Sequence, residues 1–162
     1  MIDVYIALGT NIGDRAANLR RALEALAPHV AVEKKSSVYE SVAMYVDQPR
    51  FYNMVVQGNT MLTPHDLLRF LKAIETEMGR KPDTHNEPRV IDLDILLHGQ
   101  LMLDLPELTI PHPRMHERSF VLTPLAEIAP YLEHPASRQS MIDLEDRLGY
   151  TADSIWEAGE RI

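Results

Sequence analysis

The sequence predicts an α+β fold, a ferredoxin-like βαββαβ sandwich with a C-terminal hairpin and helix added, in one domain over residues 1–162. Three observations predict it. Short apolar runs and longer runs of helical period follow one another in the order strand, helix, strand, strand, helix, strand. No Gly/Ser-rich linker or internal repeat divides the chain. Its 162 residues suffice for one core that buries roughly two thirds of the unfolded surface.

The first four elements follow from the spacing of apolar residues. Large apolar residues occupy every second position over 4–8, which predicts a strand that ends in a glycine turn. Apolar residues recur at intervals of three and four over 16–26, which is one face of a helix, until Pro28 ends the pattern. Dense β-branched residues predict strands over 32–38 and 53–60.

The remaining elements complete the sandwich. Thr63 followed by Pro64 begins a second helix that continues to Gly79. A strand over 90–97 carries Ile91, Leu93, Ile95 and Leu97 on one side and Asp92 and Asp94 on the other. We expect both helices on one sheet face and an open opposite face. Residues 100–162 add a short hairpin, irregular Pro-rich segments and a helix at 141–148, and Trp156 is expected to be a packing residue.

Composition excludes several classes of function. Sixteen Lys and Arg against 24 Asp and Glu give a net charge of −8, so we expect no nucleic-acid partner. The absence of cysteine excludes disulfides and cysteine-bound metals. Residues 1–5 do not resemble a signal peptide, and no apolar run of about 18 residues could span a membrane. We therefore expect a cytoplasmic monomer without a membrane partner, although a free sheet edge leaves dimerisation open.

Asp92 and Asp94 are the most informative pair in the chain. Two positions apart on a strand, they project from one face with backbones about 6.6 Å apart. Strands disfavour Asp, and two like charges on an apolar strand need compensation. Magnesium, which prefers oxygen ligands, would provide it. The alternative is a pair of surface acids on a solvated strand face.

Cations gather around these aspartates in a chain that is acidic overall. They are Arg80, Lys81, Arg89, His112, Arg114, His116 and Arg118. Carboxylate-bound metal and arginines that form forked contacts with phosphate oxygens are the parts of a phosphoryl-transfer site. A nucleotide polyphosphate is therefore the expected ligand. The alternative for Arg89 is a purely structural ion pair with Asp92.

Two further patterns are weaker. The glycine turn at 9–14 lacks the Lys-Ser/Thr of a Walker A loop, so it is either a ligand contact or a tight connection with Asp14 at the helix start. His112 and His116 have the spacing of a zinc pair on a helix, but the prolines that flank His112 disfavour that helix.

Four segments together resemble a known family. They are 9–14 (GTNIGD), 47–49 (DQP), 88–96 (PRVIDLDIL) and 110–118 (IPHPRMHER). The combination is similar to the 6-hydroxymethyl-7,8-dihydropterin pyrophosphokinases of folate biosynthesis, and the resemblance extends from residue 4 to about 130. It implies that the chain transfers pyrophosphate from ATP to the hydroxymethyl group of the pterin and releases AMP.

The resemblance also implies roles for individual residues. Two magnesium ions are expected on Asp92 and Asp94. The catalytic group is completed by Arg80 and Arg89, and ATP contacts are expected from Lys81, Ile95, His112 and Arg118. The pterin is expected between the rings of Phe51 and Phe120, with Asn53 and the backbone of Ser41, Val42 and Met44 at its edge. The alternative for both phenylalanines is packing against the core.

Two rival functions stay open at this point. A metal-dependent phosphohydrolase would use the same aspartates with water as the nucleophile. A non-catalytic ferredoxin-like module would bind nucleotide or pterin and consume neither. The segment 80–88 has no large apolar side chain, so we expect it to order only when ATP and magnesium bind.

Overall fold

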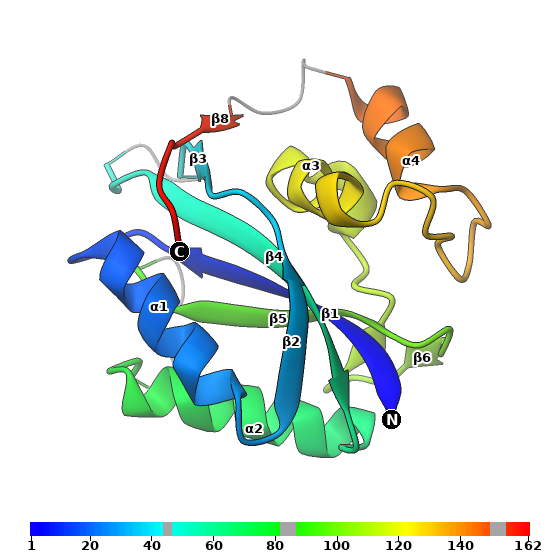
Figure 1. Ribbon diagram of the computed structural model, residues 1–162, viewed down its shortest axis with the longest axis horizontal. Coiled ribbons are helices and arrows are strands. Elements are labelled where there is room, and N and C mark those ends of the chain that lie inside the picture. Colours follow the sequence, from blue (N-terminus) through cyan, green and yellow to red (C-terminus); the bar gives the residue numbers. More distant parts are fainter. Residues whose placement is uncertain (44–46, 82–86, 150–154) are drawn as a thin grey trace.

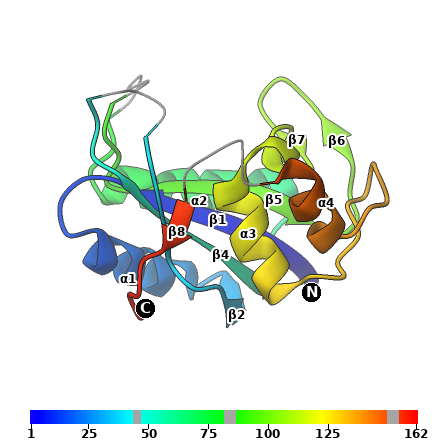
Figure 2. The ribbon, with the colours of Figure 1, turned by 90° about the horizontal axis from the view of Figure 1, so that it is seen from above.

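The computed structural model describes residues 1–43, 47–81, 87–149 and 155–162. A six-stranded antiparallel sheet lies between two helical layers (Figures 1 and 2). Its elements in chain order are β1 (Ile2–Thr10), α1 (Arg15–Leu26), β2 (Val30–Lys35), β3 (Tyr39–Ser41), β4 (Phe51–Thr60), α2 (Pro64–Glu77), β5 (Asp92–His98), β6 (Leu103–Asp104), β7 (Thr109–Ile110), a 3₁₀ turn (Met115–Glu117), α3 (Ser119–Ile128), α4 (Met141–Leu148) and β8 (Ile155–Glu157).

The predicted sandwich is confirmed. The strand order in the sheet is β5-β1-β4-β3-β8, and β2 pairs with β4 beside β3. The helix starts are where their capping residues predict them: the Asp14 side chain accepts a hydrogen bond from the Ala17 amide, and Thr63 caps α2. Among the described residues, no helix has both the length and the apolar character needed to cross a bilayer.

The single strand predicted over 32–38 is wrong. β2 ends at Lys35, and a separate strand, β3, begins at Tyr39. Ser36 lies at the break: its amide donates to the Val55 carbonyl, and its hydroxyl accepts from the Val55 amide, both over 2.9 Å. A side-chain oxygen thus replaces a backbone carbonyl of the ladder, which interrupts the strand.

The side of β5 predicted for Leu97 is wrong, because the residues of this strand do not alternate between the two sheet faces to its end. The pairing of β1 with β5 shifts between Tyr5 and Ile6, so that Tyr5 opposes Leu97 while Ile6 opposes Ile95. Because such a bulge inserts one residue, it reverses the faces of the positions beyond it. Leu97 consequently packs with Val55 instead of with Ile95.

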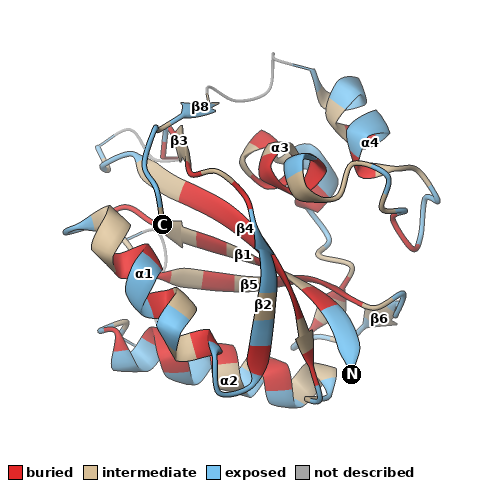
Figure 3. Ribbon diagram, viewed as in Figure 1, coloured by how far each residue is buried: buried red, intermediate tan, exposed pale blue. Residues whose placement is uncertain are grey.

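The face expected to be open is covered in part by α3 and α4 (Figure 1). Val121, Leu122 and Leu125 of α3 are buried and form a second apolar cluster with Val55 of β4. The larger cluster lies between the sheet and α1 and α2, and buried residues follow both interfaces (Figure 3). Pro124 lies within α3, and this proline made the segment resemble an irregular loop in the sequence.

Trp156 was expected to be a core or packing residue; it lies outside the core, with 37% of its surface exposed, and packs against the guanidinium of Arg50, 4.7 Å from the ring centre. It belongs to β8, a strand that the sequence did not predict. β8 pairs with β3, and the Trp156 indole donates to Glu40 over 3.1 Å. The C-terminal segment therefore returns to the edge of the sheet next to β3 (Figure 1).

The contact between α2 and the sheet permits a stability prediction. Leu71 is 1% exposed in the main cluster, so Leu71→Ala leaves a cavity and is expected to lower the free energy of unfolding by about 2–5 kcal/mol. Urea unfolding measures this change. Met61→Ala is the matched control, because Met61 is 79% exposed and its truncation should cost less than about 0.5 kcal/mol. A loss below 1 kcal/mol at Leu71, on the order of a surface change, would contradict the packing.

Candidate active site

A row of paired residues crosses the sheet and brings the predicted site residues together. Gly9 of β1 pairs with Asp92 of β5 on one side and with Asn53 of β4 on the other, and Asn53 pairs with Tyr39 of β3. Paired residues point to the same face, and strands lie about 4.8 Å apart, so the backbones of Asp92 and Asn53 are about 10 Å apart. The face is that of α3, because the Tyr39 hydroxyl reaches Glu127 of that helix.

Because Gly9 has no side chain, its neighbours approach the backbone of β1 closely. A Cβ at this position would lie 3.6 Å from both Asn53 Oδ1 and Phe51 Cδ1. These two groups therefore border the space between the carboxylates of β5 and strand β3. A flat ligand beside Asn53 and an anion beside Asp92 would meet over Gly9.

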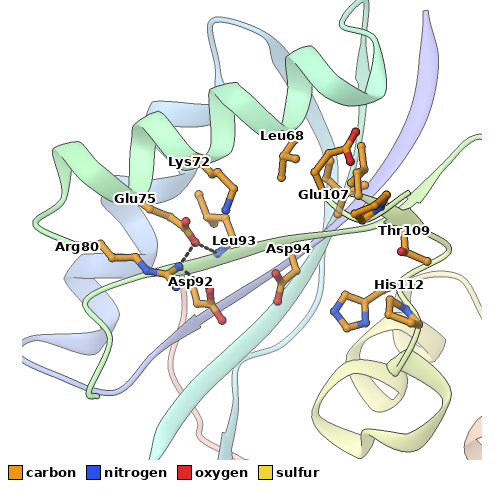
Figure 4. Close-up of a pocket in the computed structure, with 14 residues that line it drawn as sticks. Leu68, Lys72, Glu75, Arg80, Asp92, Leu93, Asp94, Glu107, Thr109 and His112 are labelled. Atoms are coloured by element: carbon orange, nitrogen blue, oxygen red, sulfur yellow. Dashed lines mark hydrogen bonds and ion pairs between the residues drawn. The ribbon is translucent and has the colours of Figure 1, made fainter. Parts of the chain in front are cut away.

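Asp92 and Asp94 project from the same side of β5, as predicted (Figure 4). Asp92 Oδ1 is 3.2 Å from Arg80 Nη1 and 4.0 Å from Arg89 Nη1. The structure thus brings together the predicted catalytic arginines and this carboxylate. Arg89 also makes the ion pair with Asp92 that was the structural alternative to a catalytic role. The distance between the two groups, 4.0 Å, is at the upper limit for an ion pair.

Glu75 is a site residue that the sequence did not indicate. It is 4% exposed at the end of α2, its Oε2 accepts from the Leu93 amide over 2.8 Å, and the same oxygen is 3.0 Å from Arg80 Nη1 (Figure 4). Arg80 therefore bridges Glu75 and Asp92. A glutamate on the buried face of a helix was the available signal, because buried acids need a partner.

Three carboxylates crowd this edge of the sheet, and their charges are under-compensated. Burial, followed by the charges of Asp92 and Glu75, raises the pKa of Asp94 to about 7, although Arg118 and Arg80 oppose the shift. Burial also raises the pKa of Glu75. A bound cation would relieve this repulsion.

The chemistry of the carboxylates fits magnesium. Within the described ranges, no three His, Asp or Glu side chains form a complete metal cage. Magnesium does not need one, because it commonly binds one or two carboxylates together with substrate phosphates and water. The site therefore suits a metal that arrives with a polyphosphate.

His112 lies beyond Asp94 on the other side of the site (Figure 4). Its backbone amide donates to the Leu96 carbonyl over 3.0 Å, and its Nδ1 accepts from the Arg114 amide over 3.2 Å. Burial, followed by the charge of Arg118, lowers the pKa of His112 to about 4. The ring is therefore neutral at pH 7 and carries its proton on Nε2, where it can donate to a ligand.

Arg118 precedes α3, and its guanidinium carbon lies 5.6 Å from the centre of the Phe120 ring. Its Nε is buried and has no hydrogen-bond partner within the part of the chain that the structure describes. A buried donor without an acceptor is costly. An anionic ligand such as a phosphate would supply that acceptor.

A cleft of about 300 Å³ lies along β5 beside Arg80, the two aspartates and His112 (Figure 4), and its lining includes neither Arg89 nor Arg118. It contains Asp92, Asp94, Ile95 and His112, all predicted site residues. Its other walls were not predicted; they include Leu68, Lys72 and Thr109. Apolar walls next to cations and a neutral histidine suit a nucleotide, whose base is flat and whose phosphates are charged.

Four of the predicted pterin residues lie on β3, β4 and α3: Ser41, Phe51, Asn53 and Phe120. Asn53 is buried, and its Nδ2 donates to the Tyr39 carbonyl over 3.2 Å and to Ser41 Oγ over 2.8 Å. Phe51 borders the space above Gly9, whereas Phe120 packs against the second apolar cluster. Core packing therefore accounts for part of the Phe120 surface.

Four other predicted contacts have less structural support. Val42 is 58% exposed and Ser41 is buried. Met44 lies outside the described residues. Lys81 is exposed, and residues 82–86 after it also lie outside the described residues, so the ordering of 80–88 on ligand binding stays a prediction.

Asn11 explains why separate motifs occur together. Its Nδ2 donates to Gln48 Oε1 over 3.2 Å and to the Pro49 carbonyl over 3.1 Å, and its Oδ1 accepts from the Arg89 amide over 2.6 Å. One buried side chain thus joins the segments 9–14, 47–49 and 88–96. The turn at 9–14 is a structural junction, in addition to a helix start capped by Asp14.

Arg114 and His116 do not belong to the site. Both are exposed and lie beside Glu117, with Arg114 Nε 3.2 Å and His116 Nε2 3.9 Å from its carboxylate. Residues Met115–Glu117 form a 3₁₀ turn, so His112 and His116 are not neighbours on an α-helix. The structure gives no support to a zinc pair within the described residues.

Comparisons with known proteins show which family the chain resembles in sequence. A family model described as 7,8-dihydro-6-hydroxymethylpterin-pyrophosphokinase (HPPK) matches residues 5–130. A Bacillus subtilis 2-amino-4-hydroxy-6-hydroxymethyldihydropteridine pyrophosphokinase is 48% identical over 82% of this chain and 81% of its own length. A Pseudomonas aeruginosa protein of the same name is 46% identical over 83% of this chain and 85% of its own length.

Longer relatives contain the same region. The folic acid synthesis protein FOL1 of Dictyostelium discoideum is 44% identical over 82% of this chain, which spans only 20% of that protein. A crystal structure of a Plasmodium falciparum HPPK-DHPS triple mutant has the same fold, with a TM-score of 0.75 at 17% identity over 90% of this chain and 43% of that one. The chain belongs to the 7,8-dihydro-6-hydroxymethylpterin-pyrophosphokinase family.

Proposed function

We propose that this chain transfers a pyrophosphoryl group from ATP, its co-substrate, to the hydroxymethyl group of 6-hydroxymethyl-7,8-dihydropterin, with two magnesium ions on Asp92 and Asp94. Membership of the family supports pyrophosphate transfer in folate synthesis. The observation that carries the proposal is the row across the sheet, in which Gly9 separates Asp92 from Asn53. It would place a metal-bound polyphosphate and a pterin on opposite sides of Gly9, on the same face of the sheet.

The proposed reaction is an in-line displacement at the β-phosphorus of ATP. The pterin hydroxymethyl oxygen forms the new bond, the bond from the β-phosphorus to the α–β bridging oxygen breaks, and AMP leaves with that oxygen. No covalent enzyme intermediate is needed. Magnesium, when bound, would neutralise charge on the triphosphate and align it.

The residues of the chain act mainly by positioning and by electrostatic stabilisation. Arg118 would satisfy its buried Nε on a phosphate oxygen, and neutral His112 would donate from Nε2. Arg80 is held between two carboxylates and has a fixed direction towards the metal site. On the pterin side, Asn53 is oriented by its contacts with β3.

A three-component reaction tests the proposal. The protein is incubated with ATP, magnesium and hydroxymethyl-dihydropterin, and the nucleotides are separated. AMP is expected only when both pterin and magnesium are present. ATP consumption without pterin would instead indicate a phosphohydrolase, and binding without consumption would indicate a non-catalytic module. The monomeric state, the lack of a nucleic-acid partner and the cytoplasmic location stay predictions from the sequence.

The pKa of Asp94 predicts how the metal-free protein responds to pH. The folded value of about 7 lies above the ordinary 3.8, so the fold favours the protonated carboxyl. The protonated Asp94 carboxyl therefore contributes to the free energy of unfolding in full below about pH 4, and this contribution is lost as the pH rises through about 7. The side chain of Asp94→Asn stays uncharged at every pH. The free energy of unfolding of this variant should therefore rise relative to that of wild type by about 1 kcal/mol between pH 6 and pH 8.

Urea unfolding in EDTA at the two pH values measures this difference. Magnesium added at pH 8 should stabilise wild type more than Asp94→Asn, because only the wild type offers two carboxylates to the ion. If the difference in free energy of unfolding between Asp94→Asn and wild type is the same at both pH values, Asp94 does not titrate in this range.

A further inference from the structure

Glu127 of α3 makes a dense set of contacts that no proposed catalytic role explains. Its Oε1 accepts from the Tyr39 hydroxyl over 2.8 Å, and its Oε2 accepts from the Ser37 hydroxyl over 2.8 Å. The Ser37 amide also points at the carboxylate, 3.0 and 3.1 Å from its two oxygens. One exposed carboxylate therefore binds three donors from the start of β3, about ninety residues earlier in the chain.

Tyr39 connects these contacts to the proposed pterin site. Its hydroxyl donates to Glu127, while its backbone carbonyl accepts from Asn53 Nδ2 over 3.2 Å. The second acceptor of that amide, Ser41 Oγ, is on the same short strand. The Asn53 amide is thus oriented by β3, and the Tyr39 hydroxyl connects the same strand to α3.

Strand β3 is held from its other face and edge as well. Glu40 points away from α3 and is 2.8 Å from Arg15 of α1. β8 pairs along the outer edge of β3. Loss of Glu127 would therefore leave β3 in the sheet and remove only its connection to α3.

Helix α3, in turn, does not depend on Glu127 for its position. Val121, Leu122 and Leu125 bury its inner face in the second apolar cluster. Arg118 and Phe120 lie at the opposite end of the helix from Glu127. Removal of the Glu127 carboxylate should consequently disturb β3 and Asn53 more than the nucleotide side of the site.

We propose that Glu127 is a positioning residue for the pterin: through Ser37 and Tyr39 it fixes β3 against α3 and thereby orients the Asn53 amide. The inference rests on the proposed function, because it assigns the pterin to Asn53. It deepens that function by adding a residue that does not touch the ligand. Burial, followed by the hydrogen bond and charge of Glu127, raises the pKa of Tyr39 well above its ordinary value, so the hydroxyl stays a donor at every working pH.

Two dissociation constants test the proposal on the full chain. One is for α,β-methylene-ATP with magnesium, and the other is for hydroxymethyl-dihydropterin in the presence of both. Glu127→Ala should weaken pterin binding about tenfold and leave nucleotide binding within about twofold, since coupling through such networks has this order of size. Calorimetric titration gives both values.

Milder variants separate positioning from folding. Glu127→Gln keeps the shape and one acceptor oxygen, and Tyr39→Phe removes one donor, so each should weaken pterin binding less than Glu127→Ala. Adding Tyr39→Phe to Glu127→Ala should weaken binding little further, because Glu127→Ala has already removed the hydrogen bond between the two side chains. Glu133→Ala is the matched control: Glu133 is also exposed and pairs with Arg138, away from the site, so both constants should stay at wild-type values.

Three results would overturn the inference. Pterin binding by Glu127→Ala within about twofold of wild type would show that Glu127 does not position β3, and equal weakening of nucleotide and pterin would show a general structural role. A wild-type protein that binds the nucleotide and no pterin would refute the proposed function together with the inference. The first two results leave the proposed function intact.

Discussion

Asp94→Ala is expected to lower pyrophosphoryl transfer by about a thousandfold or more while the protein stays folded. The side chain projects from the sheet face towards the cleft and belongs to neither apolar cluster. Its removal takes away a proposed metal ligand and also relieves the repulsion that raises its pKa. The rate of AMP formation at saturating substrates measures the loss, and circular dichroism with thermal unfolding shows whether the fold is retained.

Asp104→Ala is the matched control for this experiment. Asp104 is an exposed aspartate on β6, outside the cleft lining, so its removal should leave turnover unchanged. If Asp94→Ala keeps more than about a tenth of wild-type activity, Asp94 does not hold an essential metal.

Arg118→Ala and Arg89→Ala should each lower the turnover number by about a thousandfold. For Arg118 the reason is its buried Nε, which finds no acceptor in the described part of the chain and would find one in a phosphate oxygen. For Arg89 it is the position beside Asp92, at the edge of the proposed metal site. Lysine at either position should rescue only part of the rate, because an ammonium group cannot make the forked contact of a guanidinium.

Arg114→Ala provides the comparison. Arg114 is exposed and paired with Glu117, and it lies four residues before Arg118 in the same motif, so its loss should have little effect on turnover. The measurement is the turnover number with both substrates saturating. Near-normal values for both Arg118→Ala and Arg89→Ala would mean that these arginines are structural and that the phosphate contacts come from other residues.

Local patterns were sufficient for the elements with a clean period or a strong cap. α2 was predictable because Thr63 and Pro64 mark its start and leucines follow at helical spacing. The side of β5 that carries Asp92 and Asp94 was predictable because strand residues two apart share a face. Both properties depend on neighbours in the sequence.

Patterns failed where a contact between distant segments decided the structure. Ser36 ends β2 only because its hydroxyl reaches the Val55 amide, and the bulge opposite Tyr5 moves Leu97 to the other face. α3 was missed because Pro124 argues against a helix locally, whereas burial of the apolar face of α3 on β4 stabilises one. Tertiary packing outweighs a local preference of this size.

The βαββαβ order, the paired aspartates and the family resemblance follow from the sequence alone, because periodicity, capping residues and motifs are properties of adjacent positions. Three relations come from the folded arrangement: Gly9 lies between Asp92 and Asn53, buried Glu75 holds Arg80, and Glu127 reaches Tyr39. These relations join residues far apart in the chain. They depend on strand register and on the side of the sheet that each helix covers, which no local pattern specifies.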